Sequence, residues 1–348
     1  MATWDLDLYD LNAGSPRLSS SAFKSLMFNY QLDDPGAIEG ELYISDPDTI
    51  KANFNPGQVE IKLKRNGTKV WAGYLWLTSI NVTDYTVRFQ GEGYASKFRN
   101  RVTTDDLIYH PENVHQIMWN LINNAQSKTN GDMGVTQGAH TGGSTSVNRD
   151  YCGTEFPNLA DSLDELTTMD DGVDWLITPC ISYGTDKVFR TFNPRRGTDL
   201  SGSVTLDQDN TQTLTYEIDA TEVANDVWTI GTGDCTPPEN EQTNGSSQTN
   251  YGLMQAVEDT DYTDSRDITA HGREYIRNHK TARWTASAIY EEVNGPSWGA
   301  FDVGDIITLA SNRGYSNFSQ GMRVTGIEVN LTPPDIVFLT ITLDSVIS

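Results

Sequence analysis

A strict alternation of apolar and polar residues around an Asn-Gly pair is the feature that most constrains the fold. In GQVEIKLKRNGTKVWAGYL (residues 57–75), the apolar side chains Val59, Ile61 and Leu63 alternate with charged ones. A period of two residues is typical of a strand with one buried face. Asn-Gly is the pair that most readily adopts the φ > 0 conformation of a two-residue hairpin turn. We therefore predict a β-hairpin whose second strand starts at Lys69.

The polar face of this hairpin concentrates cations in a strongly acidic chain. The formal net charge is −24, yet Lys62, Lys64, Arg65 and Lys69 lie within one short segment. They could form a solvated sheet face, because charged faces and edges discourage unwanted strand pairing. They could instead contact an acidic surface on another copy of the chain. The sequence leaves both interpretations open.

The acidic composition limits the kinds of partner that the chain can bind. Acidic domains rarely bind nucleic acid, because a phosphate backbone requires a basic patch. The 48 acids include 32 Asp, and the 24 bases include only 9 Lys. This Asp-rich, Lys-poor bias resembles proteins of salt-in halophiles, in which molar salt shortens the Debye length to about 3 Å. An ordinary acidic protein is the alternative.

The N-terminal sequence MATWDLDLYD has neither a basic region nor an apolar run, so we predict no signal peptide. No apolar stretch approaches the roughly 20 residues of a membrane helix, and no membrane insertion is expected. Cys152, Cys180 and Cys235 are too widely and irregularly spaced for a metal site. They are interpreted as incidental thiols.

The pattern along the chain predicts a mainly β protein with an α+β middle, in three domains. The predicted limits are residues 1–104 for an N-terminal β-barrel, 105–235 for the α+β region, and 236–348 for a linker, a helix and a C-terminal β-barrel. The strands predicted for the first domain, besides the hairpin, are Trp4–Leu11, Ser25–Gln31, Ile38–Ile44 and Val87–Tyr94.

Helices are expected where apolar residues recur every three or four positions. The first is predicted to start at Pro111, the second to span residues 157–169, and the third to lie within residues 262–280. The polar segment 237–250 is predicted to be a loop or linker. Residues 296–329, with Gly304-Asp305 before an apolar strand, are predicted to form a small antiparallel barrel.

Motifs for catalysis or cofactors are missing. The chain has no His-Glu-x-x-His, no Gly-x-Ser-x-Gly and no phosphate-binding Gly-Lys-Ser/Thr ending. Two aspartate-dense stretches, residues 5–12 and 259–267, lack the spacing of a calcium loop. They are interpreted instead as a strand with outward acids and as an acidic helix start. We therefore expect no catalytic residue, no cofactor and no metal.

Several motifs occur in an order that resembles the hub, or minor tail, proteins of long-tailed phages and archaeal tailed viruses. Each motif is degenerate, and their order and spacing over most of the chain carry the resemblance. They are DDPGAIEGEL, VWAGYL, VRFQGEGYASKFRNRV, DGVDWLI, FNPRRG, NDVWTIGTGD, NYGLMQ, GREYIRN and VGDIITL followed by RVTGIEV.

This resemblance implies a non-enzymatic trimer that caps the tail tube. Two tube-like β-barrel domains per chain would give a ring of pseudo-sixfold symmetry, with a lumen through which DNA passes without specific binding. The implied partners are the distal tail protein or tail tube above and fibre or receptor-binding proteins below, at the tail tip of the virion. In such a ring the cations at Lys62, Lys64, Arg65, Lys69, Arg99 and Arg101 are candidate subunit contacts.

Two other functions remain as alternatives. A distal tail protein would form a hexamer and end in a β-sandwich, which the predicted helices at 111–127 and 157–169 disfavour. A polysaccharide-binding or polysaccharide-cleaving protein would need exposed aromatic platforms, such as Trp298, and a pair of carboxylates in a cleft.

Overall fold

The computed structural model describes most of the chain. The described residues are 2–11, 15–44, 54–143, 146–168, 172–178, 187–192, 198–232, 239–260, 262–314, 316–332 and 336–346. Cys180, Cys235, residues 193–197 of the FNPRRG motif, Asn12 and Asp261 lie outside these ranges.

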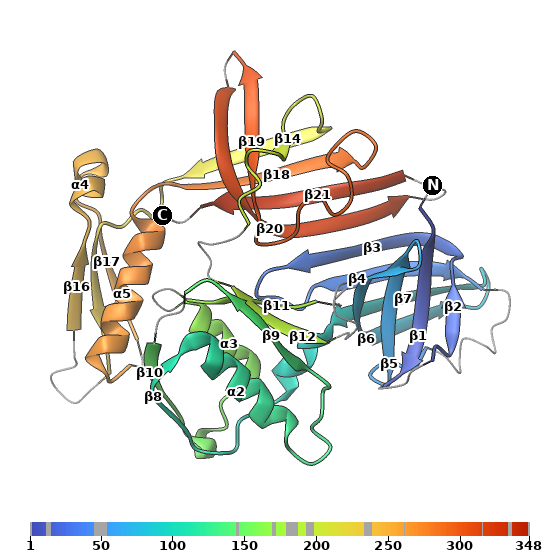
Figure 1. Ribbon diagram of the computed structural model, residues 1–348, viewed down its shortest axis with the longest axis horizontal. Helices are drawn as coiled ribbons and strands as arrows, with labels where there is room; N and C mark the ends of the chain where they lie inside the picture. The colour runs from blue at the N-terminus through green and yellow to red at the C-terminus, as the bar shows by residue number, and fades with distance from the viewer. Residues whose placement is uncertain are drawn as a thin grey trace.

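A 13-stranded sheet, counted over the described residues, is the main element of the fold (Figure 1). Its first half, called here the N-terminal wing, contains the strands β1 (Trp4–Asp10), β2 (Leu18–Ser20), β3 (Phe23–Gln31), β4 (Ala37–Tyr43), β5 (Val59–Arg65), β6 (Thr68–Asn81) and β7 (Thr86–Gly93). Its second half, the C-terminal wing, contains β13 (Thr205–Leu206), β14 (Thr213–Asp219), β18 (Arg283–Glu291), β19 (Ile306–Arg313), β20 (Ser316–Thr332) and β21 (Ile336–Ser345).

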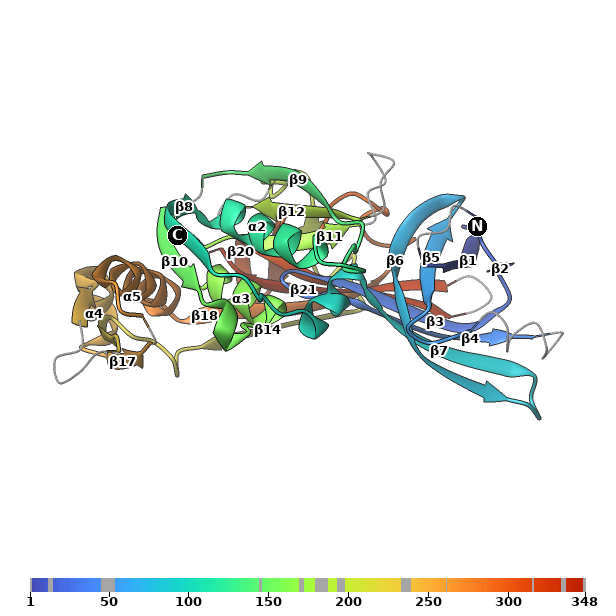
Figure 2. The same cartoon turned by 90° about the horizontal axis from the view of Figure 1, so that it is seen from below.

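The two wings join where β20 pairs with β3 in antiparallel register, from Gly326 opposite Gln31 to Leu331 opposite Leu26. One apolar core runs across this seam, because inward-facing residues of both wings belong to the same cluster. The predicted hairpin is confirmed: β5 and β6 meet at Asn66 and Gly67, both at positive φ. Figure 2 shows the β6–β7 hairpin projecting away from the rest of the N-terminal wing.

The sheet gives a mainly β fold, but the two closed barrels that the sequence suggested are not formed within the described residues. The strand order runs from β14 at one end to β2 at the other, and each of these end strands pairs with a single neighbour. Residues 306–329 likewise lie in the open sheet, as β19 and most of β20, instead of in a separate small barrel. Alternation predicts strands correctly but carries no information on closure.

A middle unit packs below the sheet in Figure 1. It consists of η1 (Tyr94–Asn100), β8 (Leu107–Asn113), α2 (Val114–Gln126), β9 (Thr136–Thr141), β10 (Ser146–Tyr151), η2 (Gly153–Glu155), α3 (Leu159–Thr167), β11 (Asp174–Thr178) and β12 (Val188–Phe192). The predicted apolar stripe of the first helix is confirmed, since Val114, Ile117, Met118, Leu121 and Ile122 are all buried.

The first helix starts later than predicted. Pro111 lies within β8, which pairs with β10 as far as Asn113 opposite Ser146. A proline suits the first turn of a helix but is equally compatible with an extended edge strand. The tertiary pairing with β10 therefore decides the boundary.

A second small unit, the α5 unit, lies beside the middle unit. It contains β15 (Asp226–Ile230), β16 (Glu239–Thr243), α4 (Gly245–Tyr251), β17 (Gln255–Asp259) and α5 (Ser265–His279). The prediction of a loop over residues 237–250 is wrong for its described part, which forms β16 and α4. Strand β16 pairs with β15, and the Asn244 side chain accepts a hydrogen bond from the backbone of Ser247 as the N-cap of α4. Their polar sequences lack the apolar period that prediction relies on.

The predicted domain limits at residues 104/105 and 235/236 stay a prediction. In the fold, β13 and β14 precede residue 235 but pair with β19 and β18, which follow it. None of the helices in the described ranges is both long and apolar enough to cross a membrane.

Gly93 tests the close packing of the N-terminal wing. A Cβ atom there would lie 1.9 Å from the carbonyl oxygen of Pro35, which belongs to the backbone and cannot rotate away. We expect Gly93→Ala to lower the free energy of unfolding by about 1–3 kcal/mol or more, measured by urea unfolding. The control is Gly202→Ala, where no atom lies within 4 Å of the added Cβ. Equal stability of the two variants would refute this packing.

Candidate functional site

The cations of the β5–β6 hairpin contact acids and aromatic rings of their own chain. Lys64 Nζ lies 2.5 Å from Asp7 on β1, a carboxylate that is only 1% exposed and also accepts a hydrogen bond from Ser19. Lys62 Nζ lies 4.2 Å from the ring centroid of Tyr9. The acids of β1 therefore do not all point outward, as the sequence suggested, because Asp7 is buried and charge-paired.

Arg65 connects the hairpin to the C-terminal wing. Its Nη2 donates to both carboxylate oxygens of Glu292, each at 2.6 Å, and its guanidinium lies 4.5 Å from the ring centroid of Trp298. Trp298 also packs edge-on against Trp4. The tryptophan is thus half-buried in an aromatic cluster, so it does not form the open sugar platform considered above.

The other candidate contact residues also have partners within the chain. Arg99 forms an ion pair with Glu92, and Arg101 donates to the backbone carbonyls of Ala125 and Gly131. Burial, followed by the charges of the neighbouring lysines, lowers the pKa of Lys69. These contacts explain why the acidic chain places cations there. A further contact of these residues with another subunit stays a prediction.

A charge cluster of two buried side chains and the half-buried Asp33, called here the three-way junction, holds the wings and the middle unit together. It consists of Asp33 after β3, Asp174 on β11 and Arg323 on β20. Arg323 donates to the carboxylate of Asp174, and both side chains are buried. Asp33 accepts a 2.7 Å hydrogen bond from the backbone of Trp175 and donates its own backbone N–H to the Trp175 carbonyl.

The junction contains one more carboxylate than cation. Burial, followed by the negative charge of Asp174, raises the pKa of Asp33 well above its ordinary value. Arg323 lowers this pKa, but its effect is smaller than that of burial. The Asp33 carboxyl therefore resists ionisation while the junction is closed.

A second buried cluster fixes the middle unit to strand β5. Lys187 Nζ lies 2.6 Å from Glu60 Oε1, and both side chains are buried. Tyr94 donates a long hydrogen bond of 3.5 Å to Glu60 Oε2. Lys187 also lies 4.7 Å from the Tyr94 ring centroid. Removing one charge of such a pair leaves the other buried without compensation.

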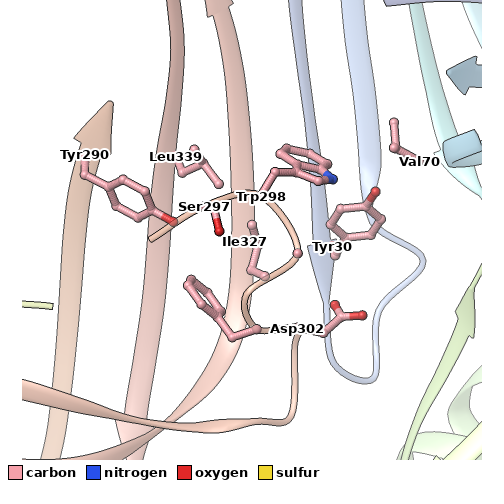
Figure 3. Close-up of a pocket in the computed structure, with 10 residues that line it drawn as sticks. Tyr30, Val70, Tyr290, Ser297, Trp298, Asp302, Ile327 and Leu339 are labelled. Atoms are coloured by element: carbon pink, nitrogen blue, oxygen red, sulfur yellow. The ribbon is translucent and has the colours of Figure 1, made fainter. Parts of the chain in front are cut away.

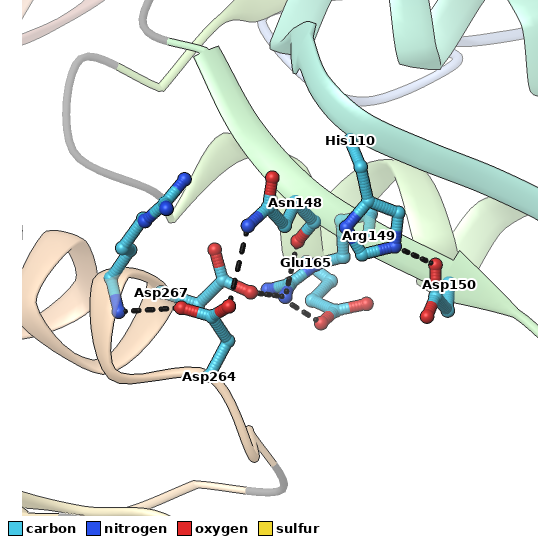
Figure 4. Close-up of polar contacts among 8 residues, drawn as sticks. His110, Asn148, Arg149, Asp150, Glu165, Asp264 and Asp267 are labelled. Carbon is cyan, nitrogen blue, oxygen red and sulfur yellow. Dashed lines mark hydrogen bonds and ion pairs between the residues drawn. The ribbon is translucent and has the colours of Figure 1, made fainter.

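A polar cleft of about 570 Å³ lies between the middle unit and the α5 unit. At its base, Arg149 donates to Asp267 at 2.9 Å and lies 3.2 Å from Glu165 (Figure 4). The guanidinium lies 4.0 Å from the ring centroid of Tyr262. Arg149 therefore connects β10 with α3 and α5 at once.

The acidic helix start predicted from residues 259–267 lies at the rim of this cleft, at the N-terminus of α5. Asp264 caps α5 by accepting from the backbone of Arg266 at 2.7 Å, and Asn148 donates to its other oxygen at 3.3 Å. Acids at a helix N-terminus complement its partial positive charge. In the part of the chain that the structure describes, no group of three His, Cys, Asp or Glu side chains could hold a metal ion.

The cleft also contains a histidine, a carboxylate and a thiol. His110 Nε2 lies 2.6 Å from Asp150 Oδ1, and the exposed Cys152 sulfur lies 3.0 Å from the Thr154 hydroxyl. No hydrogen bond between Cys152 and His110 is found among the described residues.

Comparison with known sequences gives one family match. Residues 201–348 match the family described as prophage endopeptidase tail. No curated protein matches the chain in sequence. The matched segment contains the C-terminal wing from β13 onward and the whole α5 unit.

Solved structures resemble the chain over nearly its full length. A prophage tail protein from Listeria monocytogenes is 12% identical with a TM-score of 0.65, covering 97% of this chain and 94% of that one. A tail protein from Neisseria meningitidis is 9% identical with a TM-score of 0.69, covering 98% and 96%. This chain has the fold of phage tail proteins. The described core, including the seam between the wings, is part of that shared fold.

A more distant likeness comes from Escherichia coli. That protein is described as a component of the type VI secretion system with structural similarity to the bacteriophage T4 tail proteins gp27 and gp5. It is 11% identical with a TM-score of 0.53, covering 97% of this chain and 76% of that one. At these identities the likeness concerns the fold.

The Glu60–Lys187 pair can be tested with a double-mutant cycle. We expect Lys187→Met to lower the free energy of unfolding by about 3 kcal/mol, because it leaves the buried Glu60 with only the longer 4.0 Å ion pair to Lys62 and the hydrogen bond from Tyr94. Adding Glu60→Gln should recover much of this loss, since the poorly compensated buried charge is then absent. Urea unfolding of the four proteins gives the coupling energy. Additive effects of the two substitutions would contradict the buried pair.

The raised pKa of Asp33 predicts a pH-dependent junction. A carboxyl whose pKa is higher in the folded state stabilises the fold fully only below its unfolded pKa, and this stabilisation is lost as pH rises through the folded pKa. Asn mimics the protonated carboxyl and can still accept from Trp175. We expect Asp33→Asn to be more stable than the wild type at neutral pH, with a difference that shrinks toward pH 4 in urea unfolding. A difference that does not change with pH would show that Asp33 is not the titrating group.

Proposed function

We propose that this chain is a structural subunit of a viral tail and that it acts as a tail-tip hub protein. In this proposal three copies form a ring that closes or extends the tail tube. The ring connects the tube or distal tail protein above to fibre or receptor-binding proteins below, at the tip of the virion. Genome DNA passes through its lumen without specific binding, and the subunit itself is not an enzyme.

The observation that carries this proposal is the full-length likeness to phage tail proteins. It extends over both wings and both smaller units, so the chain has the parts of such a subunit in the same order. The likeness to a secretion-system protein described as similar to T4 tail proteins favours a place at the hub among tail components.

The division of the sheet into two wings supports a trimer. Each wing is an open, curved set of strands, and one chain supplies two of them side by side (Figure 1). Three chains would present six wings, which matches a sixfold tube. In this proposal the wings are the tube-like segments, and closure comes from neighbouring chains.

The two ends of the sheet suggest how the copies meet. Strands β2 and β14 are the end strands within the described residues, and each leaves one side open to pairing. A contact between different surfaces of successive copies closes into a ring when the rotation allows it. Strand β14 carries the acids Glu217 and Asp219, which complement the cation-rich hairpin of the N-terminal wing in charge.

A net charge of −24 suits passage of DNA, because like charge discourages adsorption to the lumen wall. The same acidity fits a host with high internal salt, and the two explanations are compatible.

A hexameric distal tail protein remains the second candidate. The fold similarity includes α2 and α3, which a ring domain followed by a β-sandwich would not require. A subunit count separates the two candidates.

Strand β14 offers a direct test of the ring. Ile218 on β14 is 50% exposed, and Ile108 on β8, outside the large sheet, is 69% exposed. A lysine on an edge strand discourages pairing with another chain. We expect Ile218→Lys to weaken self-association at least about tenfold, which is about 1.4 kcal/mol, in sedimentation equilibrium. Ile108→Lys should associate like the wild type. Equal association of both variants would exclude β14 as a contact.

A further inference from the structure

An aromatic pocket opens where the two wings meet. Its walls are the rings of Tyr30 on β3, Tyr290 on β18, and Trp298 and Phe301 in the loop that follows β18. Figure 3 shows Tyr30, Tyr290 and Trp298 around a common space, together with Asp302. The cavity has a volume of about 120 Å³. Since a water molecule occupies about 30 Å³, the space fits one small organic group.

One negative charge faces this space. Of the lining residues, all of which belong to the described part of the chain, only Asp302 is charged. Its Oδ1 accepts a 2.8 Å hydrogen bond from the backbone of Val303. Its charge acts on the Tyr30 hydroxyl: burial, followed by the Asp302 charge, raises the pKa of Tyr30 well above its ordinary value. The carboxylate therefore lies close to the aromatic wall.

Asp302 is an exposed residue, so its carboxylate lies on the solvent side of the pocket. Partial shielding from water by the surrounding protein raises the pKa of its carboxyl, the hydrogen bond from the Val303 backbone lowers it, and the charge of Asp305 raises it further. The positive charge of Arg190 lowers the pKa, but by less than the shielding raises it. A cation bound between the aromatic walls would pair with this carboxylate.

Aromatic faces attract cations through the negative potential of the ring, and the attraction grows when water is excluded. This loop already shows such a contact, because the Arg65 guanidinium lies 4.5 Å from the Trp298 ring centroid. A group of aromatic rings with one carboxylate is the chemistry that recognises alkylammonium and guanidinium groups.

We propose that this pocket binds a small organic cation, with Asp302 as its counter-ion and the rings of Tyr30, Tyr290, Trp298 and Phe301 as its walls. The bound group is a quaternary alkylammonium of a free small molecule or the guanidinium of an arginine side chain from another protein segment. This binding is independent of ring formation and goes beyond the structural role proposed above.

The test compares a cation with its neutral isostere. Choline and 3,3-dimethylbutan-1-ol have the same shape, but only choline is charged. Isothermal titration of the full chain should give an affinity for choline at least about tenfold higher than for the alcohol. N-acetyl-argininamide is the probe for an arginine side chain of another protein segment. A higher affinity for it than for choline assigns the pocket to a protein segment, and the reverse assigns it to a free cation.

Two variants locate the binding. Asp302→Asn should lower the choline affinity at least about tenfold and leave the affinity for the alcohol unchanged. Phe301→Leu keeps the wall apolar but removes a ring, and should lower only the affinity for cations, by roughly two- to fivefold. The control is Glu239→Gln, an exposed acid on β16, which should change nothing. Urea unfolding midpoints establish that each variant is folded.

Three results would overturn the proposal. They are equal affinity for choline and the neutral alcohol, unchanged choline affinity in folded Asp302→Asn, and no binding of either cation at millimolar concentration. The first would identify a purely apolar pocket. The second would place the cation elsewhere on this acidic chain.

Discussion

The pairing of β20 with β3 is the constraint on which the rest of the molecule depends, because it turns two sets of strands into one sheet. The three-way junction closes the end of this seam. Arg323 on β20 donates to Asp174 on β11 of the middle unit. Asp33, in the turn after β3, accepts a hydrogen bond from the backbone of Trp175, which is also on β11. The ring proposed above requires this rigidity, since a flexible angle between the wings would prevent copies from closing around a tube.

Charge pairing within the chain accounts for the cations that stand out in so acidic a sequence. Lys64 compensates the buried Asp7, and Arg65 connects the hairpin to Glu292 in the other wing. Lys187 does the same for Glu60 between strand β5 and the middle unit. Arg65, Lys187 and Arg323 thus lie where units meet. An acidic surface, combined with internal ion pairs between units, is compatible with the proposed passage of DNA and with a host that has high internal salt.

Structural elements that depend on neighbouring residues could be predicted from the sequence, whereas contacts between residues far apart in the chain could not. The hairpin at Asn66-Gly67 and the buried stripe of α2 follow from turn chemistry and from periodicity within a few residues. The contact between Arg323 and Asp174 spans 149 positions, and no local pattern marks either residue. Strand β16 was missed because its sequence is polar. For the candidate site, the hairpin cations could be named in advance, whereas their partners and the pocket around Asp302 depend on the assembled fold.

The most direct test of the account is the subunit count of the purified assembly, measured by light scattering in physiological and in molar salt. The account predicts a mass of three times the 38.6 kDa chain in at least one of these conditions. A trimer in molar salt alone would also fit an acidic protein adapted to high salt, where screening relieves self-repulsion. A hexamer, or a monomer in both conditions, would contradict the claim that three two-winged chains form the ring.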